Sequence, residues 1–261
     1  MINLINATGL NRVRRGCRLD RKYLAKITDL RRIDLHSVDS LTRSIRTQDN
    51  FRMESFSLKE VSSPSPSEDR FENVPCVLIQ STSSTIRSSL IYINGDGEIK
   101  LDNPTWIREA ASGGLVVLGI SLPKGEPLAK AVAKSLKGVS YLDLRRDIVD
   151  YGEIFFWGKE EHGVWGLISA VLDDRIKGVV IENPPQELTL ASGESVKTVE
   201  VCKLLPPKRL VVLGHGGKSE FLDGVIKAYT EANRRENLRF EEETGRDVME
   251  KIINWVLGRT C

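Results

Sequence analysis

Cysteine is scarce in this sequence and is not arranged in pairs. The four cysteines lie far apart, at Cys17, Cys76, Cys202 and Cys261, with no C-x-x-C motif and no secretory signal pattern. A disulfide framework needs denser cysteines and an oxidising compartment, so this spacing favours reduced thiols. We therefore expect a cytoplasmic protein, with organellar targeting by the basic N-terminus left open.

Long apolar runs, excess charge and clustered histidines are also missing. No apolar stretch approaches the roughly 20 residues that span a bilayer, so no membrane segment is expected. The formal net charge of +2 indicates no nucleic acid or other polyanion as a partner of the whole molecule. The histidines, His36, His162 and His215, are too widely spaced to form a metal site locally. We therefore predict no metal and no cofactor.

The first 50 residues differ in composition from the rest of the chain. Basic residues crowd a stretch in which Asp20 is the first acid: Arg12, Arg14, Arg15, Arg18, Arg21, Lys22, Lys26, Arg31 and Arg32. Such a stretch is typical of a targeting presequence or nucleic-acid arm, or of a solvated extension with a short helix over 21–30. Because no aromatic platform accompanies the charge, we favour the extension. The predicted domains are a basic N-terminal extension over 1–50 and a folded domain over 51–261.

From residue 51 onward, β-forming runs alternate with helical patterns. Predicted strands cover 53–60, 75–81, 88–94, 115–121, 153–157, 177–181, 209–213 and 238–242. Predicted helices cover 102–112, 127–136, 141–149, 160–172, 196–205, 221–233 and 246–257. This alternation predicts an α/β three-layer sandwich, with helices on both faces of a mostly parallel central sheet. No insertion is long enough for a sizeable lid.

The stretch from 151 to 185 carries the most information about function. A buried strand, a tight turn at Gly158, an apolar-faced helix and a second buried strand form a βαβ unit. The segment LDDRIKGVV, which covers 172–180, runs from the end of the helix through the turn into the second strand. The whole stretch resembles the nucleophile elbow of the α/β-hydrolase superfamily, and the LDDRIKGVV segment is similar to that of its acetyl xylan esterase and dienelactone hydrolase-like branch. The resemblance implies this fold over roughly 53–258 and carboxylic ester or related acyl substrates.

The elbow itself departs from the family pattern. Its residues are Gly158, Lys159, Glu160, Glu161 and His162, so Glu160 stands where the resemblance places a nucleophilic serine. One hypothesis makes Glu160 a carboxylate nucleophile, although its extra methylene displaces the attacking oxygen from the position of an aspartate. The hypothesis that we favour makes Glu160 and Glu161 first-turn carboxylates that interact with the positive end of the helix dipole.

The other positions that the resemblance marks as catalytic are changed as well. The acid position holds Gly217, and the histidine position falls in Thr244-Gly245. The loop that supplies oxyanion donors in the family corresponds to Asn94, Gly95, Asp96 and Gly97, which is either a retained ligand loop or an ordinary glycine-rich turn.

The loop after the strand at 209–213 offers two further candidates. His215 lies at the same sheet edge as Glu160, so the two could form a replacement dyad, although a turn histidine is the simpler interpretation. Gly216, Gly217, Lys218 and Ser219 partly match a phosphate-binding loop. Gly214 and Gly217 are too close together to wrap a nucleotide phosphate, so a simple anion site is the better hypothesis.

These observations lead to one preferred function and two alternatives. We expect an esterase-like α/β-hydrolase-fold protein whose serine triad is lost and which acts as a binding or scaffold protein. The first alternative is an active ester or acyl hydrolase that uses Glu160 and His215. The second is phosphate or nucleotide binding at 214–219. The expected partner is a small-molecule ester or an anionic ligand, and no oligomeric state is predicted.

Overall fold

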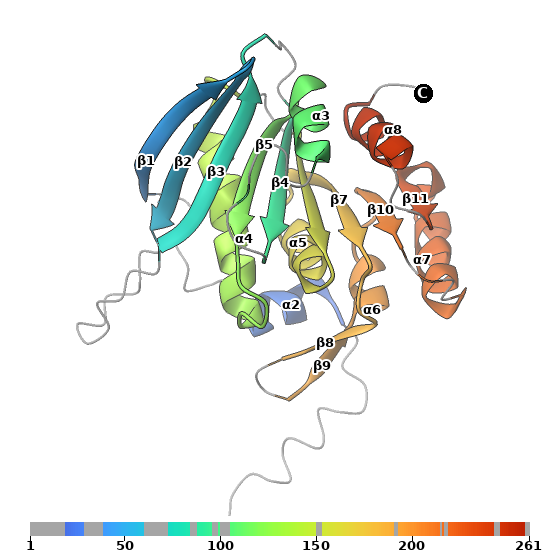
Figure 1. Ribbon diagram of the computed structural model, residues 1–261. Helices are drawn as coiled ribbons and strands as arrows, with labels where there is room; N and C mark the ends of the chain where they lie inside the picture. Colours follow the sequence, from blue (N-terminus) through green and yellow to red (C-terminus); the bar gives the residue numbers. More distant parts are fainter. Residues whose placement is uncertain are drawn as a thin grey trace, which may run out of the picture.

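A nine-stranded mixed sheet forms the centre of the molecule (Figure 1). The computed structural model describes residues 19–28, 39–59, 73–83, 88–95, 99, 105–149, 153–190, 193–214, 216, 219–242 and 246–258. The strand order is β1-β2-β3-β5-β4-β6-β7-β10-β11, with antiparallel pairing from β1 to β5 and parallel pairing from β5 to β11. The strands are β1 (Asp39–Gln48), β2 (Phe51–Lys59), β3 (Asn73–Ser81), β4 (Ser89–Asn94), β5 (Val116–Ser121), β6 (Ile154–Lys159), β7 (Ile176–Glu182), β10 (Arg209–Leu213) and β11 (Leu238–Glu241).

Helices cover both faces of this sheet and bury a separate hydrophobic cluster on each. The larger layer holds α2 (Arg21–Ile27), α4 (Leu128–Leu144), α5 (Glu161–Leu172), α6 (Thr198–Cys202) and α7 (Ser219–Glu231). The smaller layer holds α3 (Trp106–Ser112) and α8 (Arg246–Val256). The central strands are apolar on both faces because each face packs against one of these layers. The predicted α/β three-layer sandwich is therefore confirmed.

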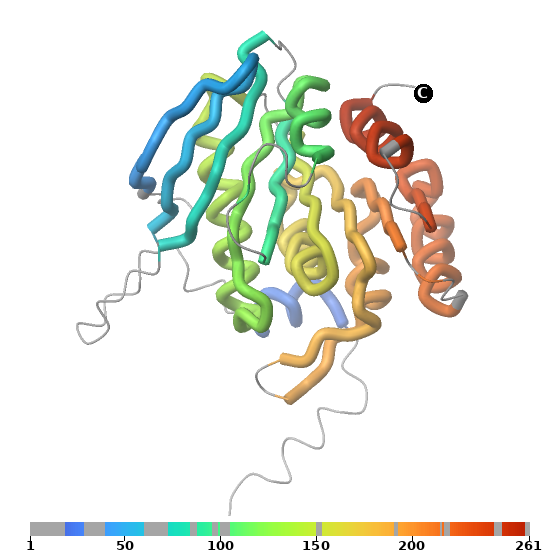
Figure 2. The backbone as a smooth tube through the Cα atoms, in the orientation of Figure 1, coloured from blue at the N-terminus to red at the C-terminus, as the bar shows by residue number. Residues whose placement is uncertain are grey.

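The predicted strands and most of the predicted helices are present, with three differences in detail. The helices expected over 127–136 and 141–149 are one continuous helix, α4 (Figure 2). Gly138, inside it, marks a close approach rather than a break, since a Cβ there would lie 2.5 Å from Ile120 Cδ1 of β5. The stretch 186–195, in which neither a strand nor a helix is predicted, holds β8 (Glu187–Thr189). The helix expected over 196–205 begins as β9 (Ser195–Lys197), which pairs with β8.

The N-terminal segment contributes more to the fold than predicted. Leu24 of α2 has no exposed surface and lies in the larger hydrophobic cluster. β1 pairs with β2 along its whole length, so the sheet continues across the predicted boundary at residue 50. The expectation that the N-terminal extension lies outside the folded domain is wrong for these two elements. Residues 1–18 and 29–38, including His36 and most of the arginines, lie outside the described residues.

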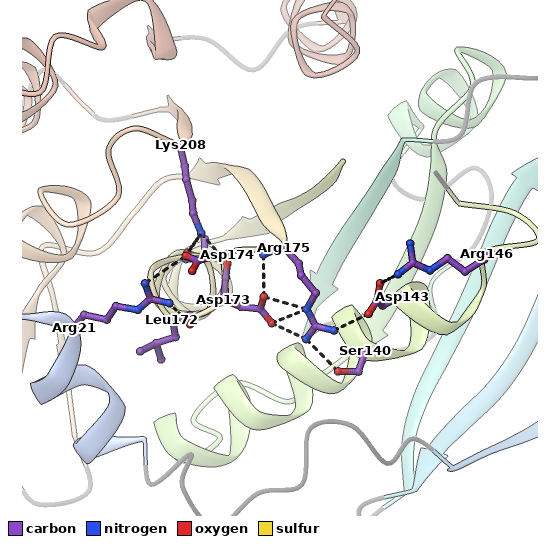
Figure 3. Close-up of polar contacts among 10 residues, drawn as sticks. Arg21, Ser140, Asp143, Arg146, Leu172, Asp173, Asp174, Arg175 and Lys208 are labelled. Atoms are coloured by element: carbon purple, nitrogen blue, oxygen red, sulfur yellow. Dashed lines mark hydrogen bonds and ion pairs between the residues drawn. The ribbon is translucent and has the colours of Figure 1, made fainter. Parts of the chain in front are cut away.

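The residues of the LDDRI sequence tie the end of α5 to its neighbours (Figure 3). Arg175 binds Asp173 at 2.7 Å and Asp143 of α4 at 3.2 Å. Lys208 donates hydrogen bonds to the carbonyl oxygens of Ala170 and Asp173, and therefore satisfies acceptors that the helix end leaves free. Arg21 of α2 donates to the Leu172 carbonyl at 2.8 Å. This segment thus has a structural role at the end of α5 remote from the elbow.

Among the described helices, none combines the length and the apolar character that a membrane-crossing segment requires.

Candidate active site at the carboxyl edge of the sheet

The turn from β6 to α5 has the sharp geometry of a nucleophile elbow. Glu160 joins the two elements with φ 55° and ψ −128°, a conformation that non-glycine residues rarely adopt. Its N–H donates to the Glu182 carbonyl at 2.7 Å. A Cβ on Gly158 would lie 2.6 Å from the Gly163 nitrogen, so only glycine fits this close contact of strand and helix. The elbow predicted at Gly158 is therefore present, with Glu160 at its apex.

The Glu160 side chain is bound to a lysine from another loop. Lys124, in the loop between β5 and α4, donates to Glu160 Oε2 at 2.9 Å. This hydrogen bond and the positive charges of Lys124 and Lys159 lower the pKa of Glu160. The Glu160 side chain is 43% exposed, so its carboxylate is ionised and accessible.

The next two elbow residues bind the same loop. Gly125 donates its backbone N–H to Glu161 Oε1 at 3.0 Å. His162 is buried, with Nε2 3.0 Å from the carbonyl oxygen of Leu122 and Nδ1 3.3 Å from that of Lys159. The stretch 122–125 is therefore fastened to three consecutive residues of the elbow.

His162 also lies against the loop in which oxyanion donors were expected. A Cβ on Gly95 would come within 2.7 Å of His162 Cε1, so the ring occupies the space beside this glycine. The Asn94 carbonyl accepts the Leu122 N–H at 2.9 Å, which holds this strand end against the stretch 122–125. The structure thus brings Asn94, Gly95 and His162 together, while Asp96 and Gly97 lie outside the described residues.

Sequence reasoning missed a half-buried carboxyl beside the elbow, that of Glu182. Glu182, the last residue of β7, pairs in register with Lys159, and its Oε1 accepts the indole N–H of Trp157 at 2.6 Å. Burial raises the pKa of Glu182, although the Trp157 hydrogen bond and the charge of Lys159 oppose the shift. Its place directly after an apolar strand was the available sequence signal, because polar side chains at carboxyl ends of parallel strands gather at one edge.

The remaining candidates fall in the loop after β10 and in the loop before α8. His215, Gly217 and Lys218 lie outside the described residues, as do Thr244 and Gly245. Gly216 is exposed with φ 64°, and Ser219 begins α7. The Glu160–His215 dyad and the anion site at 216–219 therefore stay predictions. Over the described ranges, no group of three or more His, Cys, Asp or Glu side chains is arranged to hold a metal ion.

This combination of sheet order, helix layers and sharp elbow is that of the α/β-hydrolase fold. Comparison with solved structures leads to the same fold, and the three neighbours described below are esterases. A methylesterase designated BT1017 superposes with a TM-score of 0.69 at 15% sequence identity, over 91% of this chain and 62% of that one. The chain thus spans less than two thirds of that protein's length.

Two other neighbours match over most of both chains. A CE15 glucuronoyl esterase from Teredinibacter turnerae T7901 has a TM-score of 0.65 and 13% identity, over 91% of this chain and 83% of that one. An acetyl xylan esterase from Paenibacillus sp. R4 has a TM-score of 0.63 and 10% identity, over 92% and 93%. No protein-family model matches the sequence, and no curated protein matches it either. At these identities the likeness establishes the fold.

Proposed function

We propose that this chain is an esterase-like α/β-hydrolase-fold protein that lacks serine-hydrolase activity and acts as a binding or scaffold protein. The observation that carries the proposal is Glu160 at the apex of the elbow, where its carboxylate is paired with Lys124. An ester hydrolase of this fold needs an activated nucleophile at that apex. An ionised carboxylate held by a lysine has no hydroxyl proton to give, so it cannot act as the serine of a hydrolase does.

The neighbouring contacts support the same proposal. The bonds of Glu160, Glu161 and His162 to the loop before α4 hold that loop against the elbow. The described cysteines do not offer a substitute nucleophile, because burial raises the pKa of the Cys76 and Cys202 thiols and keeps them protonated. Both are free thiols, which fits the reducing, cytosol-like compartment that we propose for the protein.

The proposal is tested with short p-nitrophenyl esters and a fluorophosphonate probe. We expect no turnover above that of the Glu160→Gln variant and no covalent labelling of the wild type. The Lys124→Met variant is the matched control, since it removes the Glu160 ion pair and leaves the carboxylate in place. Robust turnover that a serine reagent inhibits would contradict the proposal and direct attention to Ser121, at the end of β5.

The second candidate is an ester or acyl hydrolase that uses Glu160 and His215. The retained elbow conformation and the lowered pKa of Glu160 favour it, because a carboxylate nucleophile must be ionised and sharply presented. This candidate requires that Glu160→Gln and His215→Ala each abolish an activity that the wild type shows. The names of the neighbours suggest acetylated or methylated sugar esters as the first substrates to assay.

For the loop over 214–219 we propose an anion site of modest strength. Gly214 and Gly216 both have positive φ, and α7 begins at Ser219, so the loop leads into a helix N-terminus. Titration with inorganic phosphate, followed by NMR or calorimetry, tests this site. Loss of binding in Lys218→Met but not in Lys227→Met is the expected result.

A further inference from the structure

β1 is an edge strand that neither helical layer covers. Figure 1 shows it at one end of the sheet, with β2 as its neighbour. Residues 40–50 are all exposed except Ser44, which is half-buried. Leu41 and Ile45 are 54% and 55% exposed, although large apolar side chains elsewhere in the described sheet are mostly buried. In an antiparallel pair alternate residues direct their backbone N–H and C=O groups away from the partner, so the outer edge of β1 offers a row of donors and acceptors.

A bulge divides this edge and makes its second half the regular one. The pairing of β1 with β2 shifts between Thr42 and Ser44, which leaves Arg43 as the extra residue. From Ser44 to Gln48 the pairing runs without interruption. An added strand therefore has a continuous partner over these five residues, with Ile45 on one face of the sheet and Arg46 on the other.

The hairpin formed by β1 and β2, residues 39–59, carries more basic than acidic side chains. Two of the three acids in residues 39–59 have arginine partners: Asp49 binds Arg108 at 3.0 Å, and Glu54 binds Arg52 at 2.9 Å and Arg145 at 3.0 Å. The third, Asp39, is the first residue of β1 and lies outside the regular stretch from Ser44 to Gln48. Within the part of the chain that the structure describes, the side chains of Arg43 and Arg46 form neither an ion pair nor a hydrogen bond. Two exposed positive charges thus lie on either side of Ile45 in the sequence, and Arg46 is on the opposite face of the sheet.

Arg43 and Arg46 determine which kind of strand can pair with the outer edge of β1. A second copy paired edge to edge would place Arg43 and Arg46 close to the same two residues of the other copy, and like charges across adjacent strands are destabilising. An extended segment with acidic side chains would instead place carboxylates opposite the arginines and an apolar residue opposite Ile45. Backbone pairing supplies affinity in such strand addition, and the side-chain pattern supplies specificity.

We propose that the outer edge of β1 is a docking site for an extended acidic segment of another protein, which adds as a tenth strand beside residues 44–48. This surface is far from the elbow in sequence and does not depend on whether Glu160 has any catalytic role. It gives the proposed binding function a specific location and a specific partner chemistry.

The test uses a labelled eight-residue peptide of alternating valine and glutamate. We expect saturable binding in fluorescence anisotropy, and slower hydrogen exchange of the β1 amides when the peptide is bound. Arg43→Glu/Arg46→Glu should weaken binding by about tenfold or more, because two attractions become repulsions. Lys22→Glu/Lys251→Glu, which changes the net charge equally at exposed sites elsewhere, should leave binding unchanged.

Three results would overturn the proposal. The first is equal weakening by the two double variants, which indicates unspecific charge attraction. The second is binding with no change in β1 exchange, a measurement that needs only the wild type. The third is a dimer of the free protein whose β1 amides are already protected, which makes the edge an interface between two copies. A peptide of the same sequence with N-methylated backbone nitrogens should fail to bind, since it cannot donate to the strand.

Discussion

Gly158 and Gly163 allow the end of β6 and the start of α5 to meet backbone to backbone. A Cβ on either residue would lie within 2.6 Å of main-chain atoms of the other's segment, and main-chain atoms in a buried turn have little room to move. The position of the Glu160 carboxylate therefore depends on two residues that carry no functional group.

Replacing Gly158 by alanine should separate β6 from α5 and destabilise the protein. We expect a loss of about 3 kcal/mol in the free energy of unfolding, measured by urea denaturation, because the clash is with backbone. Gly113→Ala is the matched control, since a Cβ there meets its nearest atoms only at 3.3 Å, at the end of α3. Equal losses for the two variants would contradict the close contact at the elbow.

Asp173 should make the stability of the protein depend on pH in the acid range. Burial alone would raise the pKa of Asp173, but the hydrogen bonds and charge of Arg175 outweigh it and the pKa is lowered. A carboxyl group with a folded-state pKa below its unfolded value near 3.9 stabilises the fold above that value, and the stabilisation disappears as pH falls through the folded-state pKa.

The Asp173→Asn variant measures this contribution. At about pH 7 we expect it to lower the free energy of unfolding by about 2 kcal/mol, the scale of a hydrogen-bonded charge pair. The difference from wild type should shrink as the pH is lowered from about 5 to about 2.5. A difference that is constant over that range would mean that Asp173 acts through packing alone.

At the scale of elements, α2 is a short helix that fills a gap in the larger layer. Asp20 caps it by accepting the Tyr23 N–H at 2.7 Å, and Leu24 is the one residue that it buries completely. Tyr23 also donates to Glu194, between β8 and β9, so the helix contacts the hairpin as well as α5.

Leu24→Ala should therefore affect stability far more than other changes on α2. We expect a loss of about 2 to 5 kcal/mol, the range for a buried leucine that leaves a cavity. Lys22→Ala on the exposed side of the same helix should change stability by less than about 0.5 kcal/mol. Urea denaturation of both variants gives the comparison, and a near-neutral Leu24→Ala would restore the interpretation of this segment as a dispensable extension.

The elements that could be predicted from sequence are those with a buried face. β6 and β7 are apolar over most of their length because both faces are covered, and their apolar runs are visible in the sequence. β1 was missed because its residues are mostly Ser, Thr, Arg and Gln, with Leu41 and Ile45 alone as large apolar residues. A strand that buries neither face has no hydrophobic pattern to detect.

At the scale of the whole molecule, the same strands serve both hydrophobic clusters. In β7, Val179 and Ile181 face the larger layer, while Val180 faces the smaller one. If the helices of one layer detach, the face of the shared strands that they covered is exposed to water and the strands lose half of their packing. We therefore expect the two layers to unfold together.

Two variants test this cooperativity, one in each layer. Leu24→Ala weakens the larger layer, and Ile252→Ala of α8 weakens the smaller one. Each should shift a single transition, with the same midpoint by far-UV circular dichroism and by tryptophan fluorescence, to which the stacked pair Trp106 and Trp157, 4.3 Å apart, contributes. Separate midpoints for the two probes would show that the layers unfold independently.

The position of the candidate site could be predicted from the sequence, but the side-chain contacts within it could not. The glycine turn between an apolar strand and a helix identified the elbow and placed Glu160 at its apex. Lys124 lies 36 residues before Glu160, and Glu182 reaches Trp157 across 25 residues. Such pairs are set by the order of strands in the sheet, which is a property of the folded molecule and leaves no local pattern in the chain.

The backbone of Glu160 has a consequence for how the free energy of this fold is distributed. A residue with a side chain at φ 55° and ψ −128° holds the chain in a conformation that costs on the order of 1 to 3 kcal/mol, and glycine would adopt it freely. In an enzyme of this fold, the strained turn presents the nucleophile, and the strain energy thus contributes to the reaction rate. Under the binding function that we propose, this strain serves no catalytic step. The strain lowers the free energy of unfolding of the whole molecule, and it is confined to the backbone of one residue, Glu160.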